Sequence, residues 1–279
     1  MVFELRNKVV LITGGSTGIG AKIIECLLEE NVKHVTNLDI LEDKGVNLQN
    51  ELNKKYGESK VKFRKGDVTN EEQLFGAYQS IIDEYGYIDI VINNAGILND
   101  SKEKYKKEIE INLTAVVTST LKAMEVMRKD EGGKGGVVIN TSSTVALFQE
   151  SFAPIYFSTK SAVLQFSNCI GLPEYYTRTG VRVLTICFGG TDTSLLTRKN
   201  LGNFDQKVNE GMMDLINVHY KQNLLISRAE SAATAVIEAL KRGKSGSTWL
   251  SLLDKPVQDI TATVKKAYGI LGELAYNKK

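Results

Sequence analysis

Short apolar runs alternate with longer amphipathic stretches over most of the chain. The runs at 9–12 and 181–186 are rich in valine, leucine and isoleucine and are nearly continuous. Such runs are typical of parallel strands that helices cover on both faces. Between the runs, apolar residues recur at helical spacing, as Ile23 and Leu27 do within 21–30. Strands that alternate with helices in this way predict an α/β fold with a doubly wound parallel sheet of about seven strands.

The same pattern sets the expected bounds of the elements. Strands are expected at 9–12, 33–38, 61–63, 88–92, 137–140, 181–186 and 248–253. Helices are expected at 21–30, 47–56, 71–85, 107–127 and 231–240, with another that opens near Tyr156. No repeat or linker divides the sequence, so we expect a single Rossmann-type domain over residues 1–279, with helices on both faces of the sheet.

Two C-terminal segments stand apart from this alternation. Residues 191–226 place apolar side chains among charged ones, which predicts one or two amphipathic helices that form a lid over the substrate. A helical insert that only packs on the core is the alternative. Residues 256–279 form a tail that we expect to be helical and to cover a subunit interface.

Composition narrows the class of protein. Hydrophobic residues make up 42% of the chain and charged residues 24%, which is ordinary for a globular protein in water. The 35 basic and 33 acidic residues are spread without a basic stripe, so the sequence predicts no nucleic-acid partner and no membrane partner. The N-terminus is too charged for a signal peptide, and no apolar run approaches the roughly eighteen residues of a membrane span. We therefore expect a cytoplasmic protein.

Cysteine and histidine are too scattered along the chain to suggest a metal site. Cys26, Cys169 and Cys187 have apolar neighbours, so we expect buried free thiols rather than disulfide partners. His34 and His219 are distant in sequence and are expected near a strand start and in a polar helix. The sequence thus predicts no metal.

A glycine-rich segment follows the first predicted strand directly. Gly14, Gly18 and Gly20 have the spacing G-x-x-x-G-x-G, with a strand before them and a helix after them. Glycines at such positions let the backbone turn sharply and approach a pyrophosphate at a helix N-terminus. A glycine-rich turn without a ligand is the alternative, but the strand and helix on either side favour a nucleotide-binding loop.

Polar residues at three further strand ends extend this nucleotide site. Asp39 ends the second strand, where a carboxylate accepts hydrogen bonds from the adenosine ribose and repels a 2′-phosphate. This favours NAD over NADP, unless Asp39 only caps the next turn. Asp67 ends the third strand and is placed to reach the adenine amino group, although helix capping is an alternative. The small residues of 93–96 follow the fourth strand and permit close backbone approach.

A serine, a tyrosine and a lysine provide the candidate chemistry. Ser143 stands thirteen residues before Tyr156, and Lys160 follows four residues after it. If Tyr156 opens a helix, Tyr156 and Lys160 share one face, and the ammonium is expected to lower the pKa of the phenol. A tyrosine so tuned serves as a proton acceptor near neutral pH. By itself, Tyr-x-x-x-Lys is a weak signal that a solvated helix face also produces.

Taken together, these motifs have the order and spacing of a known family. Thr13-Gly14-x-x-x-Gly18-Ile19-Gly20, Asn93-Asn94-Ala95-Gly96, Ser143 and Tyr156-x-x-x-Lys160 resemble the short-chain dehydrogenase/reductase family, from about residue 7 to 250. Segments 96–100 and 246–249 look like those of the insect-type alcohol dehydrogenases and the NAD-dependent 15-hydroxyprostaglandin dehydrogenases. The resemblance implies an enzyme that uses NAD to transfer a hydride to or from an alcohol carbon.

The resemblance also assigns roles to residues. It implies catalytic roles for Asn112, Ser143, Tyr156 and Lys160, with Asn112 holding a relay water by its carbonyl or its side chain. It implies cofactor contacts from Gly14, Ser16, Thr17, Gly18, Ile19, Gly20, Asp39, Ile40, Asp67, Val68, Asn94, Ala95, Gly96, Tyr156, Lys160, Gly189 and Thr191.

The chain departs from the family pattern at two places. Phe188 replaces the usual proline before Gly189, which makes the geometry of the loop that carries Thr191 an open question. Ala153 stands where the similar prostaglandin dehydrogenases carry a glutamine, which argues against prostaglandin as the substrate.

Residues near the catalytic motif are expected to form an apolar substrate pocket. The expected walls are Leu98, Val145, Leu147, Phe148 and Phe152, together with apolar lid residues. No pair of Arg or Lys is expected to point in, so we expect an uncharged, apolar secondary alcohol or ketone rather than a sugar phosphate. A small alcohol, a terpenoid and a steroid-like alcohol all remain open.

Assembly and rival functions follow from the resemblance as well. It implies a homodimer or homotetramer built through the helices that begin near Lys107 and Tyr156. The alternatives are a non-catalytic lipid- or nucleotide-binding descendant of the same scaffold and an NADP-dependent carbonyl reductase. Against the first stands the presence of Ser143, Tyr156 and Lys160, and against the second stands Asp39.

Overall fold

The computed structural model describes residues 2–211, 214 and 226–276. Its strands are β1 (Val9–Thr13), β2 (His34–Asp39), β3 (Val61–Lys65), β4 (Ile90–Asn93), β5 (Gly136–Ser143), β6 (Val181–Phe188), β7 (Thr248–Ser251) and β8 (Gln258–Asp259). They form one sheet of order β3-β2-β1-β4-β5-β6-β7-β8. Neighbours from β3 to β7 pair in parallel, and β8 joins the edge in antiparallel orientation.

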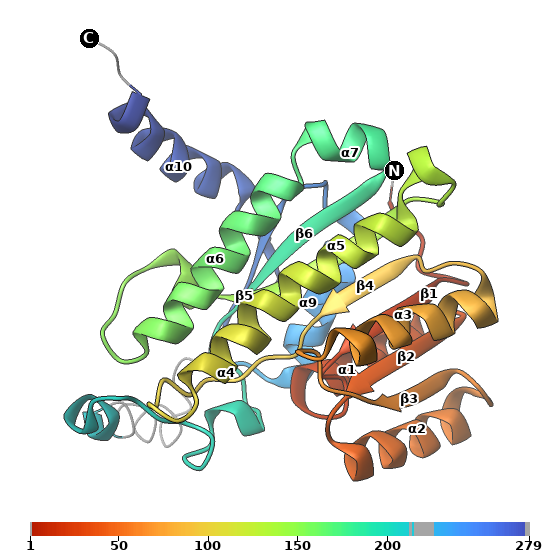
Figure 1. Ribbon diagram of the computed structural model, residues 1–279, viewed down its shortest axis with the longest axis horizontal. Helices are drawn as coiled ribbons and strands as arrows, with labels where there is room; N and C mark the ends of the chain where they lie inside the picture. Colours follow the sequence, from red (N-terminus) through yellow and green to blue (C-terminus); the bar gives the residue numbers. More distant parts are fainter. Residues whose placement is uncertain (1, 212–213, 215–225, 277–279) are drawn as a thin grey trace.

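Helices cover both faces of the sheet (Figure 1). The α-helices are α1 (Gly18–Glu29), α2 (Glu42–Tyr56), α3 (Glu71–Tyr85), α4 (Tyr105–Ile109), α5 (Ala115–Met127), α6 (Pro154–Ile170), α7 (Pro173–Thr179), α9 (Ala229–Arg242) and α10 (Thr261–Tyr276). Shorter turns are the π-helical η1 (Glu110–Thr114) and the 3₁₀ turns η2 (Lys129–Glu131), η3 (Thr144–Leu147) and η4 (Ser194–Leu196).

Alternate residues of the strands belong to two hydrophobic cores, one on each face of the sheet. Val10 and Ile12 of β1 pack in one core with apolar residues of α1 and α9. Val9 and Leu11 of the same strand face the other core, with residues of α3 and α5. Both faces of the strand are therefore buried, which explains why its sequence is continuously apolar. The predicted doubly wound parallel sheet in a single domain is confirmed.

Some element bounds differ from the prediction for identifiable reasons. Helix α2 begins at Glu42 rather than near residue 47. Gly45 reads as a helix breaker, but it lies within α2 against the Phe63 ring, where a Cβ would clash, so packing favours glycine at this helical position. The long helix expected at 107–127 is divided into α4, η1 and α5. An eighth strand, β8, adds to the expected seven because the tail turns back along β7 before α10 begins.

The predicted lid is only partly described. Residues 206–211 are helical, as expected of an amphipathic lid. Of residues 191–205, only the 3₁₀ turn η4 is helical, and residues 212–213 and 215–225, including His219, lie outside the described residues. The tail is helical as predicted, and α10 extends away from the body of the domain (Figure 1) with Ile270 and Leu271 exposed.

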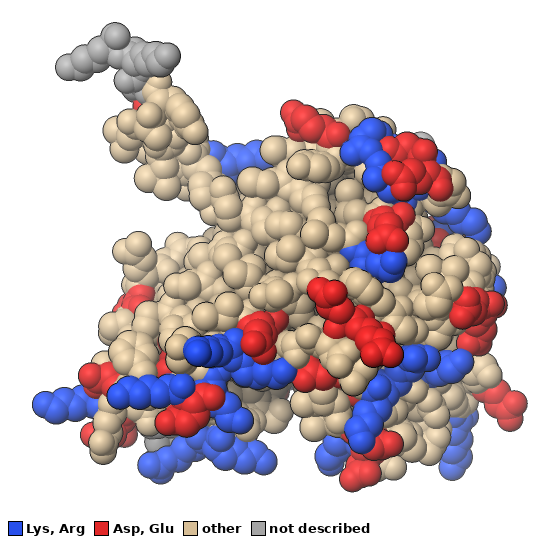
Figure 2. Space-filling model, viewed as in Figure 1, with Lys and Arg blue, Asp and Glu red and all other residues tan. Residues whose placement is uncertain are grey.

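The surface is mixed in charge. Figure 2 shows acidic and basic side chains interspersed over the lower and right-hand parts of this face, with few charges over α6 and α10. Within the described part of the chain, no helix is long and apolar enough to cross a membrane. The same residues contain no cluster of histidine, cysteine and acidic side chains that could hold a metal ion.

The cysteines correct one expectation. All three are free thiols, but only Cys187 is buried, whereas Cys26 is partly buried and Cys169 is exposed. Apolar neighbours in sequence suggested burial for all three. Cys169 lies near the end of α6 on the helix side that faces away from the sheet.

Candidate active site

A cavity of about 730 Å³ opens at the carboxyl ends of the parallel strands. It is centred where β1 and β4 lie side by side and the strand order reverses direction. Ligands bind at this switch point in doubly wound sheets. Segments that follow β1, β2, β3, β4, β5 and β6 all contribute to its lining.

The glycine loop is held by the second strand. The Gly15 N–H donates to Asn37 Oδ1 at 2.9 Å, and the Ser16 N–H donates to Asp39 Oδ2 at 2.9 Å. Gly14 has φ of +65°, and a Cβ there would lie 2.7 Å from Ala95 Cα. Glycine is therefore required at this position for both conformation and space.

Of the predicted glycine-loop contacts, all but one reach the cavity. Gly14, Thr17, Gly18, Ile19 and Gly20 line it. Ser16 lies outside its described lining and is 5% exposed, with its hydroxyl accepting a hydrogen bond from Asn37 Nδ2 at 3.1 Å. Asn37, which the sequence analysis did not single out, thus supports the loop from behind.

Asp39 lies at the cavity and also bonds to its own neighbours, and its contact with a ribose stays a prediction. Its carboxylate lines the cavity together with Ile40, yet it also accepts hydrogen bonds from the N–H groups of Ser16 and, at 3.0 Å, Leu41. Leu41 is the N-cap of α2, so the capping alternative is true as well. The residue is 7% exposed.

Asp67 is similarly shared between the cavity and its neighbours. It lines the cavity beside Val68, but it accepts hydrogen bonds from the Thr69 N–H and hydroxyl and from Lys107 Nζ, at 2.9, 2.8 and 3.0 Å. Partial burial acts to raise the pKa of Asp67, and these hydrogen bonds outweigh it, so the pKa lies below its usual value. The carboxylate is therefore charged near neutral pH.

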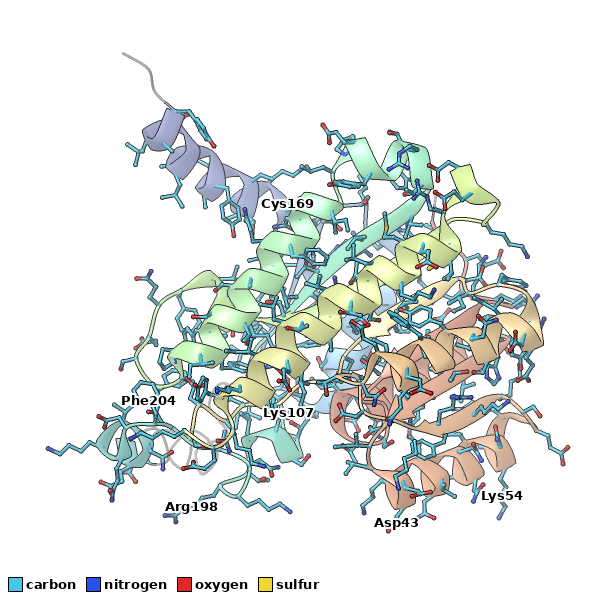
Figure 3. All side chains as sticks on the ribbon, in the orientation of Figure 1. Asp43, Lys54, Lys107, Cys169, Arg198 and Phe204 are labelled. Carbon is cyan, nitrogen blue, oxygen red and sulfur yellow. The ribbon has the colours of Figure 1, made fainter. Side chains whose placement is uncertain are left out.

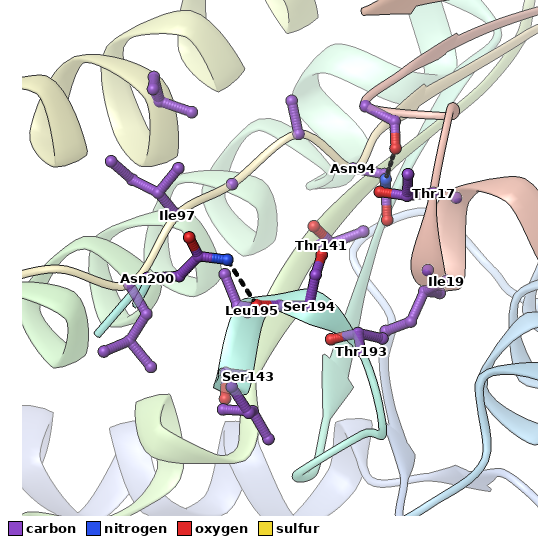
Figure 4. Close-up of a pocket in the computed structure, with 18 of the residues that line it drawn as sticks. Thr17, Ile19, Asn94, Ile97, Thr141, Ser143, Thr193, Ser194, Leu195 and Asn200 are labelled. Carbon is purple, nitrogen blue, oxygen red and sulfur yellow. Dashed lines mark hydrogen bonds between the residues drawn. The ribbon is translucent and has the colours of Figure 1, made fainter. Parts of the chain in front are cut away.

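The loop after β4 is tied to the end of β1. Asn94 Nδ2 donates to the carbonyls of Thr13 and Gly14 at 3.1 and 2.9 Å, and the Thr13 hydroxyl accepts from the N–H groups of Asn94 and Ala95. Asn94, Ala95 and Gly96 all line the cavity. Opposite them, the base of the predicted lid, with Thr193, Ser194 and Leu195, borders the same space (Figure 4).

Ser143, Tyr156 and Lys160 converge on this cavity. Ser143 ends β5, whereas Tyr156 and Lys160 lie one turn apart near the start of α6, and all three side chains are buried. Lys160 Nζ lies 5.6 Å from the centroid of the Tyr156 ring and donates to the Thr141 carbonyl at 3.2 Å. The Ser143 hydroxyl donates to the Phe188 carbonyl at 3.2 Å.

The expected direction of the Tyr156 pKa is wrong for the protein alone. Burial raises the pKa of the phenol above its ordinary value, and the nearby Glu108 acts in the same direction, while the Ser143 hydroxyl lowers it. Burial also lowers the pKa of Lys160 to about 8, against the opposing effect of Glu108. The sequence argument counted the attraction between the two groups and omitted the loss of water around both.

The side chain of Asn112 is bonded to the loop after β4. Its Oδ1 accepts from the Ile97 N–H at 2.9 Å, and its Nδ2 donates to the Ile97 carbonyl at 2.8 Å. The side chain is thus used in holding the loop after β4, and Asn112 lies outside the described lining of the cavity. The residue sits in the π-helical turn η1, a feature that often marks functional sites. The expected water relay through Asn112 stays a prediction.

The sequence model of the short chain dehydrogenase family matches residues 8–203. This chain is a short-chain dehydrogenase. The predicted family resemblance is confirmed, and with it the class of enzyme, an oxidoreductase.

Named relatives agree with this assignment. The 15-hydroxyprostaglandin dehydrogenase [NAD(+)] of Macaca fascicularis is 32% identical over 205 residues, which cover 72% of this chain and 76% of the relative. Alcohol dehydrogenase 1 of Ceratitis cosyra is 35% identical over 193 residues, covering 69% and 73%. Among solved structures, levodione reductase has a TM-score of 0.72 at 22% identity, covering 88% of this chain and 96% of that chain. A short-chain dehydrogenase/reductase from Mycobacterium marinum has a TM-score of 0.74 at 23% identity, with 89% and 95% covered.

The walls of the dehydrogenase cavity match the prediction in part. Leu98, Val145 and Phe152 line it, with Leu195 and Leu196 from the lid base.

Two of the predicted wall residues do not line the cavity. Leu147 and Phe148 lie outside the described wall and are 39% and 49% exposed. The 3₁₀ turn η3 carries this pair away from the cavity, and the Phe148 ring packs edge-on against Phe157.

The two departures from the family pattern have small structural consequences. Phe188 continues β6 to its end, in register with Ser143 of β5. Gly189 and Thr191 follow it and line the cavity. Ala153 is fully buried as the N-cap of α6 and lies outside the described lining.

Basic residues at the cavity contradict the expectation that none point in. Lys104, Lys107 and Lys199 belong to its lining. Figure 3 shows Lys107 between the part of the domain that carries Asp43 and the lid segment that carries Arg198 and Phe204. Lys107 is paired with Asp67, whereas Lys104 and Lys199 are exposed. The sequence does not predict these lysines at the cavity, because the segments that carry Lys104 and Lys199 are brought together only by the fold.

Proposed function

We propose that this dehydrogenase uses NAD to interconvert an apolar secondary alcohol and its ketone, with Tyr156 as the acid/base. The observation that carries the proposal is the meeting of Ser143, Tyr156 and Lys160 in one buried cavity that also contains the glycine loop and Asp39. A hydroxyl donor, a phenol and an amine at one spot are the groups needed to hold an alcohol and move its proton.

The residues present fit a dinucleotide. The glycine loop presents backbone N–H groups at the start of α1, and Asp39 faces the cavity from the end of β2. A Cβ at Gly96 would lie 3.6 Å from Lys160 Nζ and 3.3 Å from Asn112 Oδ1, so glycine keeps the middle of the cavity open. When bound, NAD⁺ supplies the hydride acceptor and a positive charge beside the phenol.

The side chains of the chain divide the remaining work. Tyr156 takes the proton of the alcohol hydroxyl, and Ser143 donates a hydrogen bond to the same oxygen. Lys160, with a pKa lowered to about 8, is partly charged near neutral pH and stabilises the phenolate when it forms. The main-chain carbonyl of Asn112 is the proposed anchor for the water that connects Lys160 to solvent.

NAD is preferred to NADP in this proposal because of Asp39. Its carboxylate would be a poor neighbour for a 2′-phosphate, and its position is fixed by two backbone N–H groups. The names of the similar prostaglandin dehydrogenases, which include NAD(+), support the same preference. An NADP-dependent carbonyl reductase is the alternative.

The apolar walls favour an uncharged alcohol as substrate. A second candidate is an alcohol that also carries an acidic group, because Lys104 and Lys199 line the cavity and are exposed. Residues 191–226 are the proposed lid over either substrate. A cytoplasmic homodimer or homotetramer is the proposed assembly.

Turnover measurements test the proposal. Wild-type protein and Tyr156→Phe would be assayed with NAD⁺ and NADP⁺ against secondary alcohols, with and without an acidic group. We expect NAD⁺-dependent oxidation that Tyr156→Phe abolishes. Binding of NAD⁺ without turnover of any alcohol or ketone would instead favour the non-catalytic binding protein, and equal use of NADP⁺ would overturn the argument from Asp39.

A further inference from the structure

Two carboxyl groups are fully buried just behind the catalytic cavity. Asp100 and Glu108 are each 0% exposed, and neither belongs to the described lining of the cavity. The proposed chemistry assigns no role to either residue. Buried carboxyl groups are unfavourable unless they are hydrogen-bonded or paired, so this arrangement calls for a physical explanation.

Asp100 caps the helix that carries Tyr156. Its Oδ2 accepts from the Ile155 N–H at 2.6 Å, and its Oδ1 accepts from the Tyr156 N–H at 3.1 Å. Helix α6 cannot cap itself, because its N-cap is Ala153 and its first residue is Pro154, which has no N–H. The cap of the catalytic helix therefore comes from the loop after β4.

The same residue connects α6 to the base of the predicted lid. The Asp100 N–H donates to the Gly202 carbonyl at 2.9 Å, and Asp100 forms an isolated parallel bridge with Asn203. Asn203 Nδ2 in turn donates to the Phe152 carbonyl at 2.8 Å, just before α6. Asp100 thus holds three segments together around Tyr156.

Glu108 of α4 lies against Asp100. Its Oε1 accepts from the Asn99 N–H at 3.1 Å, while its Oε2 is buried and accepts from no donor within the described part of the chain. The two carboxyl groups are close enough for a side-chain hydrogen bond. Two carboxylates cannot hydrogen-bond each other, because both are acceptors only, so one must carry a proton.

The surroundings place that proton on Glu108. Burial raises the pKa of Asp100 too, but two helix N–H groups and the hydrogen bond from Glu108 act against it, whereas Glu108 has fewer donors. Burial, and then the charge of Asp100, raise the pKa of Glu108 to about 8, while Lys160 on α6 acts to lower it. Glu110 on η1 is exposed at the surface. The charge of Glu108 also acts on Tyr156, where it raises the pKa of the phenol.

We infer that Glu108 is protonated on Oε2 and donates to Asp100, and that this acid pair is a positioning device that fixes Tyr156 in the cavity. The inference rests on the proposed role of Tyr156 in catalysis. While Glu108 is neutral, Asp100 is held against α6 and no second negative charge lies near the phenol. When Glu108 ionises, repulsion loosens the cap, and the added charge disfavours the phenolate.

The pH dependence of turnover tests this inference. Wild-type protein, Glu108→Gln and the exposed control Glu103→Gln would be compared in alcohol oxidation from neutral pH to about pH 10. The amide of Gln donates to Asp100 at every pH, so above about pH 8 Glu108→Gln is expected to lose less kcat than the wild type and the control. The loss that remains in Glu108→Gln follows Lys160, whose pKa is also about 8. Identical pH profiles for wild type and Glu108→Gln would overturn the inference.

Two further variants separate positioning from general structure. Asp100→Asn leaves one helix N–H without its acceptor, and Glu108→Leu removes the donor to Asp100. Both are expected to lower kcat about 10-fold while changing the KM for NAD⁺ less than about 2-fold. An equal loss in KM and kcat, without rescue by Glu108→Gln, would point to a structural role alone. If Glu108→Leu does not fold, Asp100→Asn and the Gln variant still decide.

Infrared spectroscopy tests the pair without any turnover. The difference spectrum between wild type and Glu108→Gln at pH 7 is expected to show the C=O stretch of a protonated carboxyl group, which disappears above about pH 8. Absence of this band would contradict the shared proton. Were the wild type to oxidise no alcohol, the proposed function would fail while this band still reported on the pair.

Discussion

The nucleotide half of the cavity and its catalytic half are stabilised in different ways. Around the glycine loop, backbone N–H groups donate to Asn37 and Asp39, and Asn94 donates to backbone carbonyls, so the loop is held by hydrogen bonds between main chain and side chains. The catalytic half buries ionisable side chains, which shifts the pKa values of Tyr156 and Lys160. The first half depends on backbone shape, and the second depends on how burial balances charge. Variants of each half should therefore fail in different measurements.

The largest expected effect is in the catalytic half. Tyr156→Phe removes the proton acceptor and is expected to lower kcat by at least about 100-fold, since acid–base groups typically contribute that much. The affinity for NAD⁺, measured by quenching of the Trp249 fluorescence or by calorimetry, should change little. A variant that keeps its kcat within a few-fold would show that another group moves the proton.

In the nucleotide half, the largest expected effect is on the fold of the loop. Gly14→Ala would combine a positive φ with a contact of 2.7 Å to Ala95 Cα, so we expect the free energy of unfolding to fall by about 3 kcal/mol and NAD⁺ binding to weaken. Gly132→Ala is the matched control, because Gly132 also has positive φ but has nothing within 4 Å of its Cβ position. Urea unfolding measures both, and equal losses would show that the close contact with Ala95 is unimportant.

A smaller effect is expected on the choice of cofactor. Asp39→Asn removes the charge while it keeps an acceptor for the Ser16 N–H, so the ratio of kcat/KM for NADP⁺ to that for NAD⁺ should rise about 10-fold. Asp43→Asn, in the first turn of the following helix, is the control and should leave the ratio nearly unchanged. If both variants shift the ratio equally, general charge rather than Asp39 determines the preference.

The smallest expected effect concerns the mouth of the cavity. Lys199→Gln should change kcat/KM for an uncharged secondary alcohol less than about 2-fold, because exposed charges contribute little to apolar binding. For an alcohol of similar length with an acidic group, a loss of several-fold is expected if Lys199 contacts that group. Steady-state kinetics at low and high salt distinguish the two, since screening should reduce only the second effect.

The two halves also differ in how well the sequence predicts them. Gly14, Gly18 and Asn94 lie in short motifs whose geometry is set by their immediate neighbours, so their places in the cavity could be expected. Ser143, Tyr156 and Lys160 were found by spacing in the same way. The protonation of Tyr156 and Lys160 could not be predicted in this way, because it depends on burial by segments distant in sequence.

The misses have the same origin. Lys104 and Lys199 meet at the cavity although 95 positions separate them, and Leu147 and Phe148 leave it because of a single 3₁₀ turn. Asp100 and Glu108 read as ordinary surface charges in a Lys- and Glu-rich segment. Only the packing of α4 against α6 shows that both are buried.

Transfer of a label from the alcohol carbon would test the central claim most directly. Wild-type protein and Tyr156→Phe would be incubated with NAD⁺ and a secondary alcohol deuterated at its carbinol carbon, and the NADH formed would be analysed by mass spectrometry. The account predicts deuterated NADH from both proteins, formed at least about 100-fold more slowly by Tyr156→Phe. Unlabelled NADH, or formation of deuterated NADH at equal rates, would contradict it.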